Sequence, residues 1–253
     1  MKYIVLSFDD GFLDFKLNAL PVLEKYKVKA TLNVVSGYAD GSVTASYGCL
    51  SVEDIQQIHN LGHEIAIHSD SHLKKTTIQD FEKCRAKISE WLNESEFGAV
   101  IPYSQRIDEE LLEYFISNNY LYVCDYSHPE FVLSLRGFLY KVKNHFFRTS
   151  KGNEIIYGLG YTYLKNEFRN SEIPKFNRIP AKKNLLPERL IQIINMLPNN
   201  GCITVVMHSI LNNENEECEW KDGAWTTDKL EKLVAYYADK SGYKIVTQRE
   251  LFR

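Results

Sequence analysis

The chain has 253 residues, of which 44% are hydrophobic, so it can bury a sizeable core in one large domain or two small ones. Its net charge of −3 gives no sign of a nucleic-acid-binding surface, and no stretch approaches the roughly 18 apolar residues of a membrane span. The five cysteines include no Cys-x-x-Cys pair, which favours reduced thiols, and the N-terminus shows no signal peptide. We therefore expect a cytoplasmic protein, although a chain trimmed of its leader would look the same.

The first half of the chain alternates strand and helix patterns. Within the first predicted helix, Pro21 indicates a kink or a new first turn. The capping-box pattern from Ser51 to Asp54 predicts the start of the second helix, and Gly62 its end. Hydrophobic periodicity predicts strands at 3–8, 28–35, 63–67, 97–101 and 120–124, and helices at 12–26, 51–59, 76–93 and 107–118.

The second half begins with a segment whose pattern is irregular. Residues 128–180 are rich in aromatic side chains, which indicates a hairpin or an insertion that covers the ligand site. Regular patterns return with helices at 187–197 and 227–239 and strands at 202–207 and 243–246. Repeated β-then-α units predict a single parallel α/β domain, and both a closed barrel and an open doubly wound sheet fit. In either fold, ligands lie at the C-terminal ends of the strands.

Two adjacent acids follow the first strand. Neighbouring side chains of a strand point to opposite faces, so Asp9 and Asp10 can share one site only where the strand ends and turns. Gly11 permits such a turn. One carboxylate could then bind a metal while the other acts as a base, and a surface Asp-Asp-Gly turn is the alternative.

Three histidines also follow strands. His68 and His72 come after the third predicted strand, and two imidazoles with one carboxylate make an open, three-ligand metal site that can activate water. Zinc is the first expectation, and cobalt, iron and nickel also suit nitrogen and oxygen ligands. His208 ends a hydrophobic strand, where it could donate a proton to a leaving group. The alternatives are surface histidines at 68 and 72 and a core histidine at 208.

The order of these motifs resembles the polysaccharide deacetylase family, carbohydrate esterase family 4, whose catalytic unit is the NodB homology domain. The family's first motif is matched by Ser7-Phe8-Asp9-Asp10, and the second by Gly62-His63-Glu64-Ile65 with His68-Ser69-Asp70-Ser71-His72. The last motif is close to Val206-Met207-His208. This resemblance covers essentially the whole chain and implies one catalytic domain over 1–253, a distorted (β/α) barrel with about seven parallel strands and an insertion around 128–180.

The resemblance also implies a role for each matched residue. Asp9 is expected to be the general base and His208 the general acid. Asp10, His68 and His72 are expected to hold one divalent metal ion. The backbone N–H of Tyr103, after the proline of the third motif, is expected to stabilise the oxyanion.

The third motif departs from the family pattern. Val100 occupies the position of the arginine that orients the catalytic aspartate. Without that cation, the pKa of Asp9 would be less depressed and the side chain less fixed. We expect Arg178 to replace it, with Arg106 as the other candidate and a surface arginine as the alternative for residue 178.

Two further positions are weaker candidates. The Asp-Trp pair of the fourth motif is not recognisable, and Asp125 is the candidate for the aspartate that supports the catalytic histidine. Trp225 could supply a hydrophobic wall near the acetyl group. Alternatively, it is a hydrophobic residue that packs at the entry of the helix beginning near Thr227.

The expected function is removal of an acetyl group from an N-acetylated sugar or glycan by a metal-dependent hydrolase. The expected partner is an acetylated carbohydrate or glycoconjugate, with no nucleic acid and no membrane span. An O-acetyl esterase, a deformylase or a small-amide hydrolase of the same superfamily is one alternative. A catalytically degenerate carbohydrate-binding module is another, which the loss of the arginine at position 100 favours and the five retained site residues oppose.

Overall fold

A computed structural model of the protein describes residues 1–104, 107–124, 161–163, 175–176, 178–197, 199–213, 216, 218 and 223–251. The strands are β1 (Lys2–Phe8), β2 (Thr31–Val34), β3 (Glu64–Ile67), β4 (Ala99–Val100), β5 (Val123–Cys124), β6 (Tyr161–Tyr163), β7 (Lys175–Phe176), β8 (Arg178–Pro180), β9 (Gly201–Met207), β10 (Ile210–Leu211), β11 (Trp225–Thr226) and β12 (Tyr243–Val246). The helices are η1 (Phe15–Ala19), α1 (Leu20–Lys25), α2 (Ser36–Ala39), α3 (Val52–Asn60), α4 (Ile78–Leu92), η2 (Pro102–Ser104), α5 (Glu109–Ser117), α7 (Pro187–Asn195), α8 (Thr227–Tyr237) and η6 (Arg249–Leu251).

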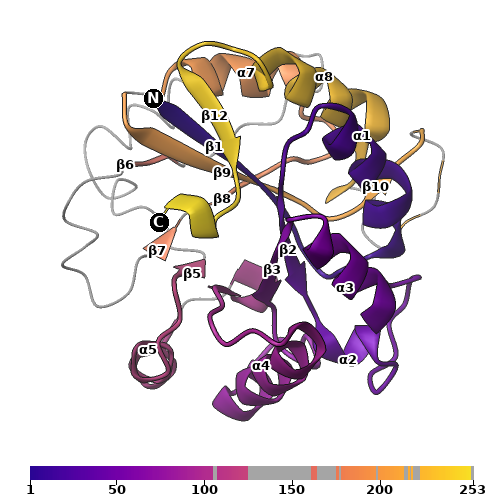
Figure 1. Ribbon diagram of the computed structural model, residues 1–253, viewed down its shortest axis with the longest axis vertical. Coiled ribbons are helices and arrows are strands. Elements are labelled where there is room, and N and C mark those ends of the chain that lie inside the picture. The colour runs from indigo at the N-terminus through magenta and orange to yellow at the C-terminus, as the bar shows by residue number, and fades with distance from the viewer. Residues whose placement is uncertain are drawn as a thin grey trace.

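Parallel strands form a nearly closed barrel with the helices outside it (Figure 1). The strand order is β9-β1-β2-β3-β4-β5-β7, and every neighbouring pair on this path is parallel. β7 pairs with β5, while β8, one residue further on, pairs with β9 and so joins the two edges. Counting β7 and β8 as one strand gives the predicted seven, and the barrel rather than the open sheet is confirmed.

Two extra strands explain why the barrel is distorted. β12 pairs with residues 2–5 of β1, whereas β2 pairs only with residues 7 and 8. On the other side, β6 runs antiparallel to the start of β9, and β8 pairs further along the same strand. The strands therefore spread apart at the N-terminal end of β1 and β9. Their C-terminal ends, where the candidate site lies, stay within the barrel.

Local sequence signals account for where the main helices begin. α1 begins at Leu20 with Pro21 in its first turn, which is the second of the two possibilities that the sequence left open for this proline. The Ser51 side chain accepts a hydrogen bond from the backbone N–H of Asp54, and the Asp54 side chain accepts one from that of Ser51, which confirms the predicted capping box of α3. Thr77 and Asp108 cap α4 and α5 by accepting one hydrogen bond each, from the backbone N–H of Asp80 and of Leu111.

The two faces of the strands bury different kinds of side chain. In β3, Ile65 and Ile67 belong to the large core between strands and helices, whereas Ala66 belongs to a small cluster with Val100 and Tyr122. This alternation follows from the two-residue repeat of a strand and places the small cluster inside the barrel. Buried polar side chains share the interior, namely Ser7, Thr31, Asn33, Glu64 and Thr204.

The segment around 128–180 is described only in part. Of its residues the structure describes β6, β7 and β8, and the rest lie outside the described residues. The sequence pattern predicted no strand at 178–180, where the barrel closes. In the described part of the chain, no helix has the length and apolar composition needed to cross a bilayer.

Candidate active site

The end of β1 turns sharply and brings both acids to one side. β1 ends at Phe8, and the next turn has positive φ at Asp10 (75°) and Gly11 (77°). A positive φ is uncommon in residues other than glycine, but aspartate tolerates it better than most. The turn therefore involves Asp10 as well as the glycine that the sequence indicated. Asp9 is 3% exposed and Asp10 6% exposed.

Asp9 is held from two directions. Nη1 of Arg178 donates to Oδ1 of Asp9 at 2.6 Å and to Oδ2 at 2.7 Å, and Nδ2 of Asn33 donates to Oδ1 at 2.6 Å. The Arg178 side chain is 8% exposed, so water screens this ion pair little. Burial acts to raise the pKa of Asp9, but Arg178, His68 and His208 outweigh it and lower the pKa below its ordinary value. Asp9 is therefore a fixed carboxylate.

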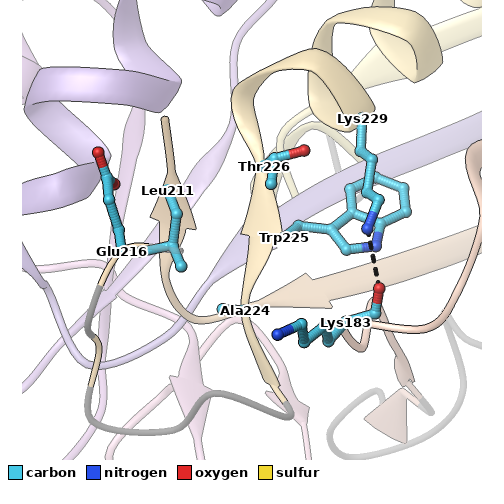
Figure 2. Close-up of a pocket in the computed structure, with 7 residues that line it drawn as sticks. All are labelled: Lys183, Leu211, Glu216, Ala224, Trp225, Thr226 and Lys229. Atoms are coloured by element: carbon cyan, nitrogen blue, oxygen red, sulfur yellow. Dashed lines mark hydrogen bonds between the residues drawn. The ribbon is translucent and has the colours of Figure 1, made fainter. Parts of the chain in front are cut away.

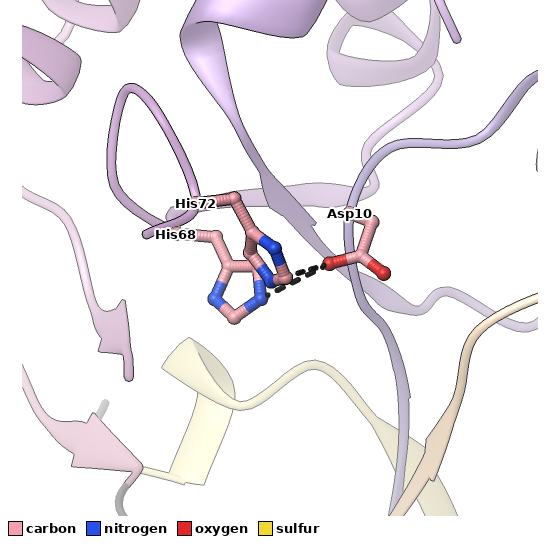
Figure 3. A group of neighbouring side chains, drawn as sticks. All are labelled: Asp10, His68 and His72. Carbon is pink, nitrogen blue, oxygen red and sulfur yellow. Dashed lines mark ion pairs between the residues drawn. The ribbon is translucent and has the colours of Figure 1, made fainter. Parts of the chain in front are cut away.

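Asp10, His68 and His72 come together at the ends of β1 and β3 (Figure 3). Oδ1 of Asp10 lies 3.3 Å from Nε2 of His68 and 3.1 Å from Nε2 of His72. The three ligand atoms all lie within 4.8 Å of one another. Burial acts to raise the pKa of Asp10, but the two histidines outweigh it and lower the pKa, so the carboxyl is ionised.

The donor set fits a divalent metal ion. Nδ1 of His68 lies 2.8 Å from the carbonyl oxygen of Val100, and since a carbonyl only accepts, Nδ1 carries a proton and Nε2 is the nitrogen that can bind a metal. Oδ1 of Asp10 is buried and has no hydrogen-bond partner among the described residues. A buried carboxylate oxygen beside two imidazole nitrogens offers the oxygen and nitrogen ligands that a divalent cation takes.

His208 lies beside Asp9, directly after β9. Its Nε2 is 3.9 Å from Oδ2 of Asp9, and its side chain is 22% exposed. Burial lowers the pKa of His208, and Asp9 and Asp10 act in the opposite direction without cancelling that effect. Once protonated, the imidazolium is a stronger acid than that of a free histidine.

Tyr103 lies at the exposed edge of this group. Its ring centroid is 4.6 Å from that of His72, and the residue is 55% exposed. Tyr103 also has a positive φ of 54°, which for an aromatic residue marks a strained backbone. Strain of this kind persists where the surrounding structure holds it, and it is often found at functional sites.

Trp225 is buried in the main core and is 1% exposed. Its indole N–H donates to the carbonyl oxygens of Lys182 and Leu185, at 3.1 and 3.0 Å. It borders a cavity of about 10 Å³, which is roughly the space of one water molecule (Figure 2). These contacts match the packing alternative at the entry of α8, which begins at Thr227.

The sequence reasoning missed two groups that contact the site residues. Asn33 donates to Asp9 and also to the hydroxyl of Ser7, and the signal was an amide between the apolar Leu32 and Val34 of a predicted strand. The second is the carbonyl of Val100, whose backbone contact a sequence cannot show. Two other candidates, Arg106 and Asp125, lie outside the described residues.

Comparisons with known proteins give a likeness to one family over residues 1–123 and a shared fold. Residues 1–123 match the sequence model of the family described as polysaccharide deacetylase. No curated protein has a sequence that matches this chain. Among solved structures, the Xyl-CE4 domain of a multidomain xylanase from the hindgut metagenome of Trinervitermes trinervoides is 16% identical with a TM-score of 0.55, and the match covers 99% of this chain and 89% of that one.

Two other structures have a similar fold. A family 4 acetyl xylan esterase from Clostridium thermocellum, in complex with a cobalt ion, is 19% identical with a TM-score of 0.54, and the match covers 99% of this chain and 90% of that one. A CE4 family pseudoenzyme from Bacillus anthracis is 14% identical with a TM-score of 0.56, covering 99% of this chain and 65% of that one. At these identities the likeness shows the barrel fold. Residues 1–123 are thus similar to the polysaccharide deacetylase family, and the chain has the barrel fold of these CE4 structures.

Proposed function

We propose that this protein is a metal-dependent hydrolase that removes an acetyl group from an N-acetylated sugar or glycan. The observation that supports it most is the adjacency of two separately held carboxylates. Asp9 faces a guanidinium, and Asp10 faces the Nε2 atoms of two imidazoles. One acid is thus suited to proton transfer and the other to holding a cation.

Asp10, His68 and His72 would hold one divalent ion, with zinc as the first expectation. When bound, such an ion polarises an acyl carbonyl and eases the ionisation of water. The protein contributes the orientation of the ligands, because the Val100 carbonyl fixes the ring of His68. Three protein ligands leave room for water and substrate, which is typical of catalytic rather than structural sites.

Proton transfer would involve Asp9 and His208 in turn. Asp9 would take a proton from the attacking water, since its lowered pKa keeps it ionised and Arg178 and Asn33 keep it in place. His208, 3.9 Å from Asp9, would give a proton to the departing amine as the carbon–nitrogen bond breaks and acetate forms. Water supplies both the oxygen of the acetate and the proton that restores the site.

Tyr103 would serve the substrate in two ways. Its backbone N–H would stabilise the oxyanion, as the family resemblance implies. Its exposed ring beside His72 offers an apolar face at the edge of the site, against which a sugar ring could pack. This ring favours a carbohydrate over a small acyl amide.

O-acetyl esterase activity is the second candidate, because the fold is also that of an acetyl xylan esterase. A carbohydrate-binding module without activity is the third, because a CE4 pseudoenzyme shares the fold and Val100 replaces an arginine. Arg178 argues against the third candidate, since it supplies a guanidinium to Asp9 from another strand.

The substitution Asp9→Asn tests the proposal. We expect the variant to bind Zn²⁺ or Co²⁺ as the wild type does, and to lose acetate release by roughly 10³-fold, because a general base typically contributes about 10²- to 10⁴-fold. Asp228→Asn, on the exposed first turn of α8, is the control and should keep full activity. Full activity in Asp9→Asn would remove Asp9 as the base and contradict the mechanism.

A further inference from the structure

The loop that carries both histidine ligands has a strained backbone. Ser69 has a φ of 68° and His72 a φ of 50°, both in the left-handed region. Residues other than glycine adopt this region at a cost in conformational free energy, so the loop needs contacts that hold it. The hydroxyl of Ser69 supplies one of them by accepting a hydrogen bond from the backbone N–H of His72 at 3.0 Å.

The centre of this loop is a buried charge that takes no part in the metal site. Asp70 is 1% exposed. Its Oδ1 accepts from Nζ of Lys87 and from the hydroxyl of Ser36, both at 2.6 Å, and its Oδ2 pairs with Nζ of Lys83 at 2.5 Å. Both carboxylate oxygens are therefore occupied, and the charge of Asp70 is compensated away from the histidines.

The partners of this loop lie on one face of α4. Asp80, Lys83 and Lys87 are spaced three and four residues apart, which aligns their side chains along the helix. Asp80 accepts from the backbone N–H of Ser71 at 3.1 Å and from its hydroxyl at 2.5 Å. The backbone N–H of Asp70 also donates to the carbonyl of Asp80 at 3.2 Å.

The opposite side of the loop is held by the start of α2. The backbone N–H of Ser36 donates to the carbonyl of Ser69 at 3.3 Å, and that of Gly37 donates to the carbonyl of Asp70 at 2.9 Å. A Cβ atom on Gly37 would lie 2.4 Å from this Asp70 oxygen, so only glycine allows the approach. The loop is thus fixed between two helices before any metal binds.

We propose that the face of α4 formed by Asp80, Lys83 and Lys87 holds the loop 68–72 in its metal-binding conformation, the two lysines through Asp70 and Asp80 through Ser71. Asp70 is then a positioning residue that brings both imidazoles to Asp10 at once. The inference rests on the proposed function only in taking this loop to bind a metal. The expected consequence of this positioning is a higher metal affinity, because a preformed loop loses less conformational freedom when the ion binds.

Metal affinity tests the proposal without reference to catalysis. Co²⁺ is titrated into the metal-free full-length protein and followed by its visible absorption. We expect Asp70→Asn to weaken Co²⁺ binding by about 10- to 100-fold, as residues that orient metal ligands typically do. Asp40→Asn removes the other carboxylate that pairs with Lys87, at 2.6 Å and outside the loop, and should change the Kd by less than about twofold.

A second variant separates the effect of the lost loop contacts from the effect of the lost Asp70 charge. The double variant Asp70→Asn/Lys83→Met restores the local charge balance but not the contacts of the loop. Positioning requires Co²⁺ binding to stay weak in this variant, and recovery of wild-type affinity would overturn the proposal. If Asp70→Asn does not fold, Ser71→Ala removes only the hydroxyl contact with Asp80 and should weaken binding a few-fold.

His68→Ala distinguishes failure of this inference from failure of the metal site. Wild-type affinity in folded Asp70→Asn or, in its place, Ser71→Ala, together with loss of binding in His68→Ala, overturns the positioning role alone. Wild-type affinity in His68→Ala as well overturns the metal site and the inference with it.

Discussion

Two adjacent aspartates have different environments in this site. Asp9 is surrounded by donors, namely the Arg178 guanidinium and the Asn33 amide, while Asp10 faces the nitrogens of His68 and His72. The turn at Asp10 and Gly11, with φ of 75° and 77°, is what lets neighbouring side chains share one site without sharing partners. In the proposed mechanism, two residues of the same type thus take different roles because their surroundings differ.

Asp14, at the start of η1, is a titratable residue outside this group. Burial raises the pKa of Asp14 from 3.8 to about 6, and Glu216 adds to the effect while Ser209 and Ile210 oppose it. Because the folded-state pKa lies above the unfolded value, the folded state binds the proton more tightly. The contribution of Asp14 to stability is therefore full below about pH 4 and is lost as pH rises to about 6.

Asp14→Asn removes this pH dependence. A difference of about two pKa units corresponds to at most roughly 3 kcal/mol, so the free energy of unfolding of the variant should rise relative to the wild type by about 1–3 kcal/mol between pH 4 and pH 7. Urea denaturation at several pH values measures it, with Asp228→Asn as the control. A difference between variant and wild type that is independent of pH would refute this account of Asp14.

At the scale of the element, β8 is the segment that completes the site. It closes the barrel against β9 and carries Arg178, so the strand that joins the two edges also supplies the cation for Asp9. Val100, on β4, lies in the barrel interior where the family resemblance expects that cation. The guanidinium reaches Asp9 from a different strand.

Arg178→Ala should lower kcat on the order of 10²-fold with little change in KM, because a displaced base costs rate rather than binding. Arg189→Ala, on the exposed face of α7, is the matched control and should leave both constants unchanged. The double variant Arg178→Ala/Val100→Arg tests whether a guanidinium on β4 can replace the one on β8. Part of the lost kcat should return in this variant. Unchanged kinetics in Arg178→Ala would remove this residue from the site.

The elements also show what the sequence could and could not predict. Long periodic segments such as α4 and β9 were predicted to within a few residues, since their hydrophobic repeats span several turns or alternations. β8 was missed because its three residues are too few to show a repeat. Arg178 could be named as a candidate from the missing arginine, but only the pairing of β8 with β9 brings it to Asp9.

At the scale of the molecule, the barrel interior is also polar near the N-terminal end of β3, away from the site. Glu64, at the start of β3, accepts hydrogen bonds from the Tyr122 hydroxyl at 2.7 Å, the Thr31 hydroxyl at 2.8 Å and the backbone N–H of Arg249 at 2.8 Å. A Cβ on Gly98 would lie 2.0 Å from the Tyr122 ring, so this glycine makes room for it. The network ties β2, β3, the residue preceding β5 and the C-terminal segment together.

Tyr122→Phe removes one donor to the buried Glu64 carboxylate. The free energy of unfolding should fall by roughly 1–3 kcal/mol, because a buried acceptor loses a partner that water does not replace. Tyr26→Phe is the matched control, since its hydroxyl donates at 3.0 Å to the partly exposed Glu231, and it should cost less than about 1 kcal/mol. Equal losses in urea denaturation of the two variants would contradict the importance of burial here.

The measurement that tests the central claim most directly is acetate release by the metal-reconstituted protein. The substrates are N-acetylglucosamine oligomers, acetylated xylan and small N-acyl sugars, with His68→Ala as the control. The account predicts metal-dependent release from the N-acetylated sugars and none from His68→Ala. Release from acetylated xylan alone would favour the esterase. No release from any substrate, with the metal shown to be bound, would contradict the hydrolase and favour the carbohydrate-binding module.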